Sequence, residues 1–382
     1  MLYQEMDGCQ KIPLSINAAN PSTRSWSIGL FPARYGKKEN MVSMAVKMAD
    51  GQSGPRPLDL RRDLKQVAAL IEEAFGPELD AAGWAALREL RMAARLGPLL
   101  GLLTPAGAGP NDMIDGFVWI EDGRVVGNVT VQRNPQFPSR YLIANVAVQK
   151  KYRGRRIASE LMRLALKHIA SQNARWAMLQ VRADNDIARG MYQRLSFAEI
   201  MEEHRLRAET PPSVPATPLP PGGELRVLSN DDWHAVRYLI SRGMPADARW
   251  WHPARASGFR TGSSPSFQRR LSRWLGMGHK VRWGLFVGEE LAGVLDVDVL
   301  VFNEHRVDIL LRPDLCKDWT APLLAHALRY LHRQPQRPVS AVLYDYQPEA
   351  IAALQTFGFA PFLTLVNMRK RVAARPQVNE FW

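Results

Sequence analysis

The stretch YLIANVAVQKKYRGRRIASELMR (residues 141–163) connects an apolar run to an amphipathic segment through a short basic loop. The apolar run is typical of a buried β-strand. Apolar side chains then recur at helical spacing from Ile157 onward, which predicts a helix. The loop between them holds Gly154 and the cations Lys150, Lys151, Arg153, Arg155 and Arg156. A helix N-terminus behind such a loop binds phosphates readily. A solvated basic turn is the alternative interpretation.

The segments around this stretch predict an alternation of helices and strands. Helices are expected over about 63–75 and 84–96, because apolar residues recur there at helical spacing. Two apolar runs around Asp122 and Gly123 predict a β-hairpin over 116–132. After the basic loop we expect a strand over 176–181, a short helix over 186–195 and a strand over 197–207. This order predicts a protein of the α/β class.

The second half of the chain repeats this order of elements. A proline-rich segment, 210–223, predicts an extended connector and a domain boundary. After it we expect a strand and a helix over 224–240, a hairpin that turns at Gly288 and Glu289, and a helix over 319–331. The halves align without a gap, with 162 residues between partners, as in Val181/Leu343, Ala188/Ala350, Gln193/Gln355 and Phe197/Phe359. One register and one order predict an internal duplication.

The composition limits the class of protein. The 382 residues are 46% hydrophobic, enough for two or three domain cores. No apolar run reaches the roughly 18–20 residues that span a bilayer, and no signal peptide pattern is present. Cys9 and Cys316 form no disulfide or metal-binding pattern, so we expect a cytoplasmic protein without a bound metal. The net charge of +13 favours an anionic partner but does not identify it.

Two residues near the end of the first half carry a resemblance to a known family. Asn185 and Tyr192 are seven positions apart, so they share one helix face. Together with the basic loop, they make the chain resemble the GNAT acetyltransferase superfamily. The pyrophosphate loop of that family, Arg/Gln-x-x-Gly-x-Gly/Ala, is matched at Arg153 and Ala158. Its later signature is matched by Asn185, Ala188, Tyr192 and Phe197.

The chain departs from the family pattern at two positions. Arg156 stands where the family has the first motif glycine, and Ser196 replaces the glycine before Phe197. A side chain at position 156 must point to solvent or contact the phosphates, because the cofactor approaches the backbone there. Gly154 can supply part of the missing backbone freedom. The departure at Arg156 concerns the affinity for the cofactor more than the fold.

The resemblance implies a fold class and a domain plan. The fold is α/β (α+β), with two tandem GNAT-like domains, each a mixed, mostly antiparallel sheet flanked by helices. The expected parts are a flexible leader over 1–56, an acetyltransferase domain that binds CoA over 57–207, a proline-rich linker over 208–223, a degenerate GNAT-like domain over 224–370 and a tail over 371–382.

The resemblance also implies a reaction, in which acetyl-CoA is the co-substrate and a primary amine of a small molecule or protein attacks the thioester directly. Tyr192, a phenol with an ordinary pKa near ~10, is the implied general acid. A strand N–H polarises the thioester carbonyl. The implied CoA-binding residues are Val146, Ala147, Val148, Arg153, Gly154, Arg155, Arg156, Ile157, Ala158 and Asn185. A half-buried tyrosine and a helix cap are the alternatives for Tyr192 and Asn185.

No general base is evident from the sequence. The fourth strand offers Asn145 and no carboxylate. Glu72 and Glu73, at the end of the first expected helix, and Asp115, in the hairpin, are candidates that would act through water. For each of them an ordinary surface acid is the alternative interpretation.

The second half lacks these features. Its aligned loop, DLCKDWT (residues 314–320), has no glycine and places Asp314 and Asp318 where phosphates would lie. Gln347 and Leu354 occupy the positions that correspond to Asn185 and Tyr192. We therefore expect a GNAT-like unit that does not bind CoA and that supports the first unit or shapes the acceptor cleft.

One segment supports a different function. Residues 249–283 contain no acid, many arginines and several tryptophans, a composition that suits single-stranded nucleic acid or another polyanion. The alternative to the enzyme is therefore a non-catalytic polyanion-binding protein on a GNAT scaffold. A packing surface between the two domains is the simpler interpretation of the same residues.

Overall fold

The structure is a computed structural model that describes residues 53–76, 84, 87–88, 90–92, 115–134, 137–252, 278–300 and 304–372. Residues 84, 87–88 and 90–92 are helical, as predicted for the second helix. Most of the expected leader, the rest of 77–114, the middle of the basic aromatic segment (253–277) and most of the tail lie outside the described residues.

Both halves follow the predicted order of elements. The first half contains β1 (Gly54–Pro57), α2 (Leu60–Phe75), β2 (Asp115–Glu121), β3 (Arg124–Arg133), β4 (Arg140–Val148), α4 (Ile157–Ser171), β5 (Trp176–Arg182), α5 (Asp186–Arg194) and β6 (Ala198–Ala208). The second half contains β7 (Gly223–Val227), α6 (Trp233–Gly243), α7 (Ala246–Trp251), β8 (His279–Val287), β9 (Glu290–Val299), β10 (His305–Leu311), α10 (Cys316–His332), β11 (Val339–Tyr344), α11 (Pro348–Thr356) and β12 (Ala360–Arg371).

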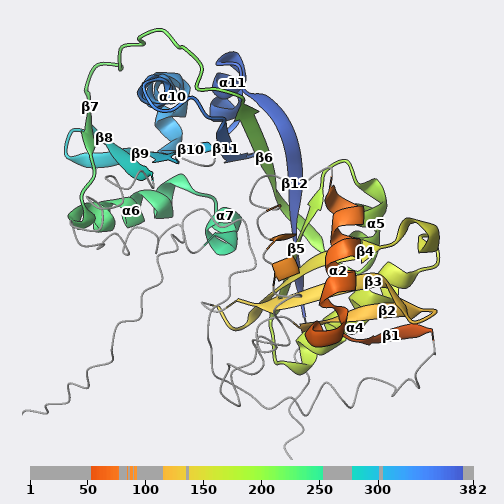
Figure 1. Ribbon diagram of the computed structural model, residues 1–382. Coiled ribbons are helices and arrows are strands. Elements are labelled where there is room, and N and C mark those ends of the chain that lie inside the picture. The colour runs from red at the N-terminus through yellow and green to blue at the C-terminus, as the bar shows by residue number, and fades with distance from the viewer. Residues whose placement is uncertain are drawn as a thin grey trace, which may run out of the picture.

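The strands join into one twelve-stranded sheet in the order β1-β2-β3-β4-β5-β12-β6-β11-β10-β9-β8-β7. Equivalent strands of the two halves lie at equal distances from its centre. The last strands are exchanged between the halves, because β12 lies beside β5 and β6 lies beside β11 (Figure 1). The predicted mixed, mostly antiparallel character is confirmed, with parallel pairing at β4–β5 and β10–β11. The two expected sheets are thus merged into one.

The register at the centre of the sheet reproduces the sequence repeat. β12 pairs with β6 in antiparallel fashion, and Leu365 lies opposite Glu203. These two residues are separated by the same 162 positions that align the halves. Equivalent residues can lie opposite each other only if an approximate two-fold axis passes between them. The register therefore supports the predicted duplication.

Helices cover both faces of the sheet in each half. Val118 packs with the apolar face of α2, whereas its neighbour Phe117 packs with α4, because successive strand residues point to opposite faces. In the second half, α10 and α11 cover one face, and α6 and α7 cover the other. The hairpin at Asp122 and Gly123 is confirmed, and both residues have positive φ, 49° and 70°.

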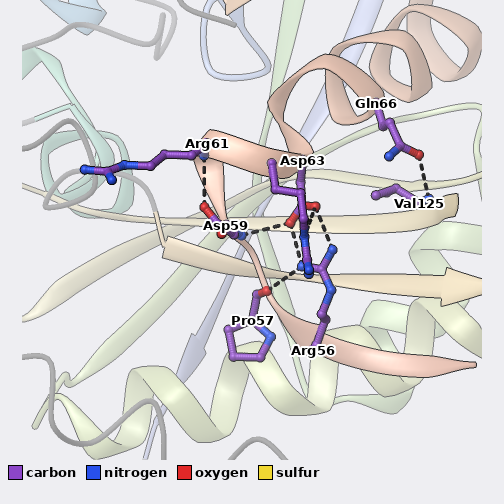
Figure 2. Close-up of polar contacts among 8 residues, drawn as sticks. Arg56, Pro57, Asp59, Arg61, Asp63, Gln66 and Val125 are labelled. Atoms are coloured by element: carbon purple, nitrogen blue, oxygen red, sulfur yellow. Dashed lines mark hydrogen bonds and ion pairs between the residues drawn. The ribbon is translucent and has the colours of Figure 1, made fainter. Parts of the chain in front are cut away.

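The corner between β1 and α2 is fixed by a buried ion pair (Figure 2). Two nitrogens of Arg56 lie 2.6 Å from the two carboxylate oxygens of Asp63, and the side chain of Asp63 is fully buried. The backbone N–H of Asp59 also donates to Asp63, at 2.9 Å. Gln66, one turn further along α2, accepts from the backbone N–H of Val125 at 3.0 Å. These contacts fix α2 against the strand that precedes it and against β3.

The described beginning of the basic aromatic segment packs between the two halves. Trp250 of α7 lies edge-on to Trp176 of β5, with ring centroids 5.3 Å apart. The guanidinium groups of Arg140 and Arg369 lie 4.3 and 4.8 Å from the centroid of the Trp250 ring. Trp251 is 1% exposed. For these residues the structure supports the packing interpretation of the segment.

One predicted element boundary in the second half is wrong. The helix expected over 319–331 begins one turn earlier, at Cys316, directly after a 3₁₀ turn over Pro313–Leu315. The helix thus includes residues that were expected to form a loop. In the proline-rich segment, residues 211–220 form neither helix nor strand, and Val214 and Leu219 pack on the core of the second half.

Candidate functional site

β4 and β5 diverge after a short parallel contact. Their pairing is confined to Arg140–Leu142 and Trp176–Met178, although β4 continues to Val148 and β5 to Arg182. β5 is paired with β12 on its other side, so the open edge is the one that faces β4. Backbone groups of β4 between residues 143 and 148 are therefore unpaired with β5 and accessible to an extended ligand.

The direction of these backbone groups follows from the contacts of β4 with β3. The N–H of Gln149 donates to the carbonyl of Val126 on β3. Because backbone groups alternate between the two sides of a strand, the N–H groups of Val148 and Val146 point to the open side. The carbonyl of Val148 accepts a hydrogen bond from Nε of Arg153 at 3.0 Å. Two donors from the predicted set thus line the open edge.

The predicted phosphate loop follows β4 and ends at the N-terminus of α4. Gly154 has a φ of 81°, and a Cβ atom added there would meet no atom within 4 Å. Arg156 precedes the helix in a left-handed conformation, with φ 61° and ψ 9°. The left-handed backbone shape that glycine adopts most readily is therefore present at Arg156. Its cost in a residue other than glycine is about 1–2 kcal/mol.

Close packing brings the loop and the strand together. A Cβ atom on Gly127 of β3 would lie 2.9 Å from Cγ2 of Ile157 and 3.1 Å from Cδ1 of Leu161. The missing side chain of Gly127 therefore lets the first turn of α4 approach the sheet. The role of Gly127 was not predicted from the sequence, although a glycine inside an apolar strand is a signal of close backbone approach.

The cations of the loop differ in what they contact. The ammonium group of Lys151 and the guanidinium group of Arg155 lie 4.6 and 5.1 Å from the centroid of the Tyr152 ring. Arg163 forms an ion pair with Glu160 on the exposed face of α4. Arg155 and Arg156 are both exposed. The loop thus presents positive charge beside the unpaired N–H groups of the helix N-terminus, the arrangement that binds phosphates.

The other two predicted residues lie on α5, which follows β5. Asn185 is the N-cap of this helix, and its Oδ1 accepts from the backbone N–H of Ala188 at 3.1 Å. The cap engages Oδ1 of the amide group, and the Asn185 side chain is exposed. Tyr192 is buried in the apolar cluster that also contains Val146 and Val148. Burial raises the pKa of Tyr192, so its phenol is protonated at neutral pH.

The three candidate bases are engaged in other contacts. Glu72 forms an ion pair with Arg91. Glu73 accepts from the backbone N–H of Lys150 at 3.4 Å, which places it at the start of the loop. Asp115 lies 3.2 Å from Nε2 of His168, a buried residue of α4. These contacts favour structural roles for the three acids.

The second half replaces the loop with helix. Cys316, Lys317 and Asp318 correspond to Gly154, Arg155 and Arg156 by the 162-residue offset, and all three lie in the first turn of α10. The carboxylate of Asp314 is paired with Arg312, which lowers the pKa of Asp314. The residues that would form a phosphate loop at this position are therefore part of the helix.

The gap between β10 and β11 is bridged by a side chain. Nε2 of Gln347 donates to the carbonyl of Ile309 on β10 at 2.8 Å, and its Oε1 accepts from the N–H of Tyr344 on β11 at 3.3 Å. A pocket of about 50 Å³ remains beside Gln347, lined in part by Leu311, Cys316 and Thr320. This volume holds a few water molecules and is too small for an extended cofactor arm.

Comparisons with known proteins agree with this geometry. Residues 84–197 match the model of the acetyltransferase (GNAT) family. The chain is 33% identical over 88 residues to a mycothiol acetyltransferase of Corynebacterium glutamicum, which covers 23% of the chain and 29% of that protein. It is 30% identical over 91 residues to N-alpha-acetyltransferase 30 of Schizosaccharomyces pombe, covering 23% of the chain and 61% of that protein. The chain thus spans less than two thirds of either relative.

The fold also matches a solved structure with two such units. A tandem GNAT protein from the clavulanic acid biosynthesis pathway superposes with a TM-score of 0.51 and 16% sequence identity, over 84% of this chain and 99% of that one. At this identity the likeness concerns the fold alone. Within the described residues, no helix is long and apolar enough to cross a membrane. The same residues contain no group of three or more His, Cys, Asp or Glu side chains placed to hold a metal ion.

Proposed function

We propose that this chain, whose residues 84–197 match the model of the acetyltransferase (GNAT) family, is an acetyl-CoA-dependent N-acetyltransferase with its active site in the first repeat. The observation that carries the proposal is the contrast between the two open edges. Beside β4 the chain combines unpaired strand N–H groups, a glycine-containing basic loop and a helix N-terminus. Beside β10 the corresponding positions are helix and a bridging glutamine.

The residues of the first site fit the parts of acetyl-CoA. In the proposal, the backbone N–H groups between Arg153 and Ala158 hold the pyrophosphate, because the loop has left-handed backbone where a close approach is needed. Arg155 and Arg156 add positive charge. The N–H groups of Val146 and Val148 pair with the pantetheine arm and the thioester carbonyl. The NH₂ group of Asn185 donates to the same arm.

The chemistry needs one bond to form and one to break. The amine nitrogen attacks the thioester carbon, the C–S bond breaks, and a thiolate leaves. In the proposal, Tyr192 protonates that thiolate. A phenol whose pKa is raised by burial is a weak donor. It therefore transfers its proton only as charge develops on sulfur, in the same apolar surroundings that raise the proton affinity of the thiolate.

Among the residues that the structure describes, Glu72, Glu73 and Asp115 each contact another group. In the proposal none of these three acts as the base, and the attacking amine loses its proton to solvent. The acceptor then reacts as the fraction of neutral amine present in solution. The rate at low acceptor concentration should accordingly rise with pH until the pKa of the amine is reached.

The acceptor belongs to one of two classes. One relative is named for mycothiol and the other for N-alpha acetylation, so small primary amines and protein α-amino groups are both proposed. A panel of small amines, peptides with free α-amino groups and lysine peptides with blocked α-amino groups would distinguish them. Turnover confined to one class assigns the acceptor.

Calorimetry with acetyl-CoA tests the proposal. The wild-type protein should bind acetyl-CoA, and Tyr192→Phe should bind it with an affinity within about threefold, because the hydroxyl acts on the leaving group. The variant should turn over more slowly on every amine of the panel. Absence of binding by the wild-type protein would reject the enzyme. Unchanged turnover by Tyr192→Phe would reject this residue as the acid.

Polyanion binding through residues 249–283 remains a second candidate. The cluster of Trp250 with Arg140 and Arg369 supplies packing instead of an exposed surface, which weakens this candidate for the described part of the segment. Binding of a fluorescent oligonucleotide that falls steeply with salt, and that is lost when the arginines between 253 and 277 become glutamine, would support it.

A further inference from the structure

β4 contains a bulge where it borders the open edge. Asn128 of β3 lies opposite Ala147, whereas Thr130 lies opposite Ala144, so β4 has one residue more than β3 between these pairs. Asn145 within this step has a φ of 52°, in the left-handed region. An extra residue reverses the direction of the backbone groups that follow it, relative to a regular strand. The bulge therefore determines that the N–H groups of Val146 and Val148 face the open edge.

One buried side chain holds the bulge. Nδ2 of Asn128 donates to the carbonyl oxygen of Asn145 at 2.9 Å. A carbonyl oxygen can only accept, so this contact fixes which end of the Asn128 amide points at it. Nδ2 of Asn128 also lies 3.3 Å from Oγ1 of Thr130, which in turn lies 3.4 Å from Nδ2 of Asn145. The three side chains form a polar cluster on the α2 side of the sheet.

This arrangement is unfavourable for stability in two ways. Asn128 is fully buried, and its Oδ1 has no hydrogen-bond partner in the part of the chain that the structure describes. Asn145 adds the strain of a left-handed residue. Buried side-chain acceptors without a partner are uncommon, and so are left-handed residues inside a strand. Their coincidence at the open edge indicates that the bulge serves something other than folding.

The second half shows the same strand pair without these features. Gly127 and Gly293 are each the fourth residue of their strands, β3 and β9, so Asn128 corresponds to Val294. β9 pairs with β10 in an unbroken register from Gly293/Leu311 to Asp298/Arg306. The bulge and the asparagine are both present beside the open edge of the first half. Both are missing beside the bridged edge of the second.

We propose that Asn128 is a positioning residue for the acetyl-transfer reaction: its amide holds the carbonyl of Asn145, and the bulge thereby aims a β4 N–H at the thioester carbonyl. This inference rests on the proposed function. Asn128 itself is buried beneath the strand and touches no substrate. It acts through the backbone between Asn145 and Val148.

The test compares two variants of Asn128 with a matched control. Asn128→Val introduces the residue of the second half, and Asn128→Asp keeps the shape but places an acceptor against the Asn145 carbonyl. The control is Gln66→Leu, which removes another amide that binds the backbone of β3, at Val125, away from the bulge (Figure 2). The readouts are acetyl-CoA and CoA affinities, the infrared carbonyl band of bound [1-¹³C]acetyl-CoA, and steady-state kinetics.

In the wild-type protein the carbonyl band should lie below its position in free acetyl-CoA, because a hydrogen bond polarises the carbonyl. In both Asn128 variants the band should return toward the free position. The kcat should fall about 100-fold, as when an oxyanion donor is lost, while the affinity for CoA, which lacks the acetyl group, changes less than about threefold. Gln66→Leu should leave the band and kcat close to wild type.

Four results separate the possibilities. A wild-type protein that does not bind acetyl-CoA contradicts the proposed function itself. A wild-type protein that binds it without a shifted carbonyl band overturns the inference and needs no variant to do so. Variants with the wild-type band and kcat show that Asn128 is only a core amide. Returned bands and slow turnover in the Asn128 variants, but not in Gln66→Leu, establish the positioning role.

Discussion

The two halves of the molecule differ in the connection from β4 to α4 and the corresponding connection from β10 to α10. After β4 the chain forms a 3₁₀ turn over Lys150–Tyr152 and then passes through irregular basic residues, with positive φ at Gly154 and Arg156, before α4 begins. After β10 the chain enters α10 within a single 3₁₀ turn, and the residues that correspond to the loop are helical. The fold therefore does not require the loop. The first half retains a strained, charged connection that the second half has replaced with regular structure.

The largest expected effect concerns whether the halves can be separated at all. Removal of residues 360–382 deletes β12, which lies between β5 and β6 and is therefore part of the sheet of both halves. We expect this truncation to abolish cooperative folding, because β5 and β6 lose their common neighbour. A chain that ends at Val372 keeps β12 and serves as the control. Thermal unfolding followed by circular dichroism measures the cooperativity of both chains. A cooperative transition in the truncated chain would contradict the prediction.

Corresponding ion pairs at the two outer corners should differ in strength. Asp63 is fully buried against Arg56, whereas Asp232 pairs with Arg226, whose side chain is 43% exposed. Asp63→Ala leaves the guanidinium of Arg56, whose side chain is 16% exposed, without its partner and should cost about 3–5 kcal/mol. Asp232→Ala should cost less than about 1 kcal/mol. Denaturant titrations measure the free energy of unfolding of the two variants. Equal losses of stability would contradict the difference in burial between the two ion pairs.

The corner at Asp232 also predicts a dependence on pH. The hydrogen bond from Arg226 lowers the pKa of Asp232 below its ordinary value. The carboxylate therefore stabilises the folded state above the unfolded pKa of about 4, and this contribution is lost as the pH falls through the folded pKa. The stability difference between wild type and Asp232→Ala should be constant from pH 5 to 7 and vanish in stronger acid. A difference that persists below about pH 2 would refute the linkage.

A matched charge reversal tests which half binds the cofactor. Arg155→Glu and Lys317→Glu change corresponding positions, one in the loop and one in the first turn of α10. Arg155→Glu should weaken acetyl-CoA binding at least about tenfold, because it places an anion beside the proposed pyrophosphate site. Lys317→Glu should leave the affinity within about twofold. Calorimetry measures both, and similar losses in the two variants would remove the distinction between the halves.

The smallest expected effect concerns the strain in the loop. Arg156→Gly removes a left-handed residue that costs about 1–2 kcal/mol, and the added freedom of the unfolded chain offsets about 0.5–1 kcal/mol of that gain. The net stabilisation should be about 0.5–1 kcal/mol, with a Tm about 1–3 °C higher. Differential scanning calorimetry detects such a shift. A lower Tm would mean that the Arg156 side chain stabilises the folded loop.

The same variant tests the role of the charge at this position. If Arg156 contacts phosphate, Arg156→Gly should bind acetyl-CoA a few times more weakly and with a smaller dependence on salt. Arg156→Gln, which keeps a side chain without the charge, is the control that separates charge from backbone shape.

Much of the fold was predictable because it depends on local patterns. The hairpin at Asp122 and Gly123, the strand-loop-helix order around Gly154 and the repeat with its 162-residue offset were all visible in the sequence and are present in the structure. The start of α10 was misplaced, because Trp319 begins the apolar pattern while Cys316 begins the helix. Apolar periodicity identifies the buried face of a helix but does not indicate where an exposed first turn begins.

The candidate site was predictable only in part. Loop residues and the spacing of Asn185 and Tyr192 are features of sequence. The capping bond of Asn185 and the burial of Tyr192 became visible only in the structure. Asn128 was missed because an asparagine inside an apolar strand gives no signal until the carbonyl that it holds is known.

The order of elements, the duplication and the difference between the basic loop and its acidic counterpart can be read from the sequence, because these depend on neighbours along the chain. The exchange of β6 and β12, the divergence of β4 from β5 and the bulge at Asn145 are visible only in the folded molecule. Each of these depends on which strand lies beside another. That choice rests on packing between segments far apart in the chain, such as Asn128 with Asn145 or Gln347 with Ile309.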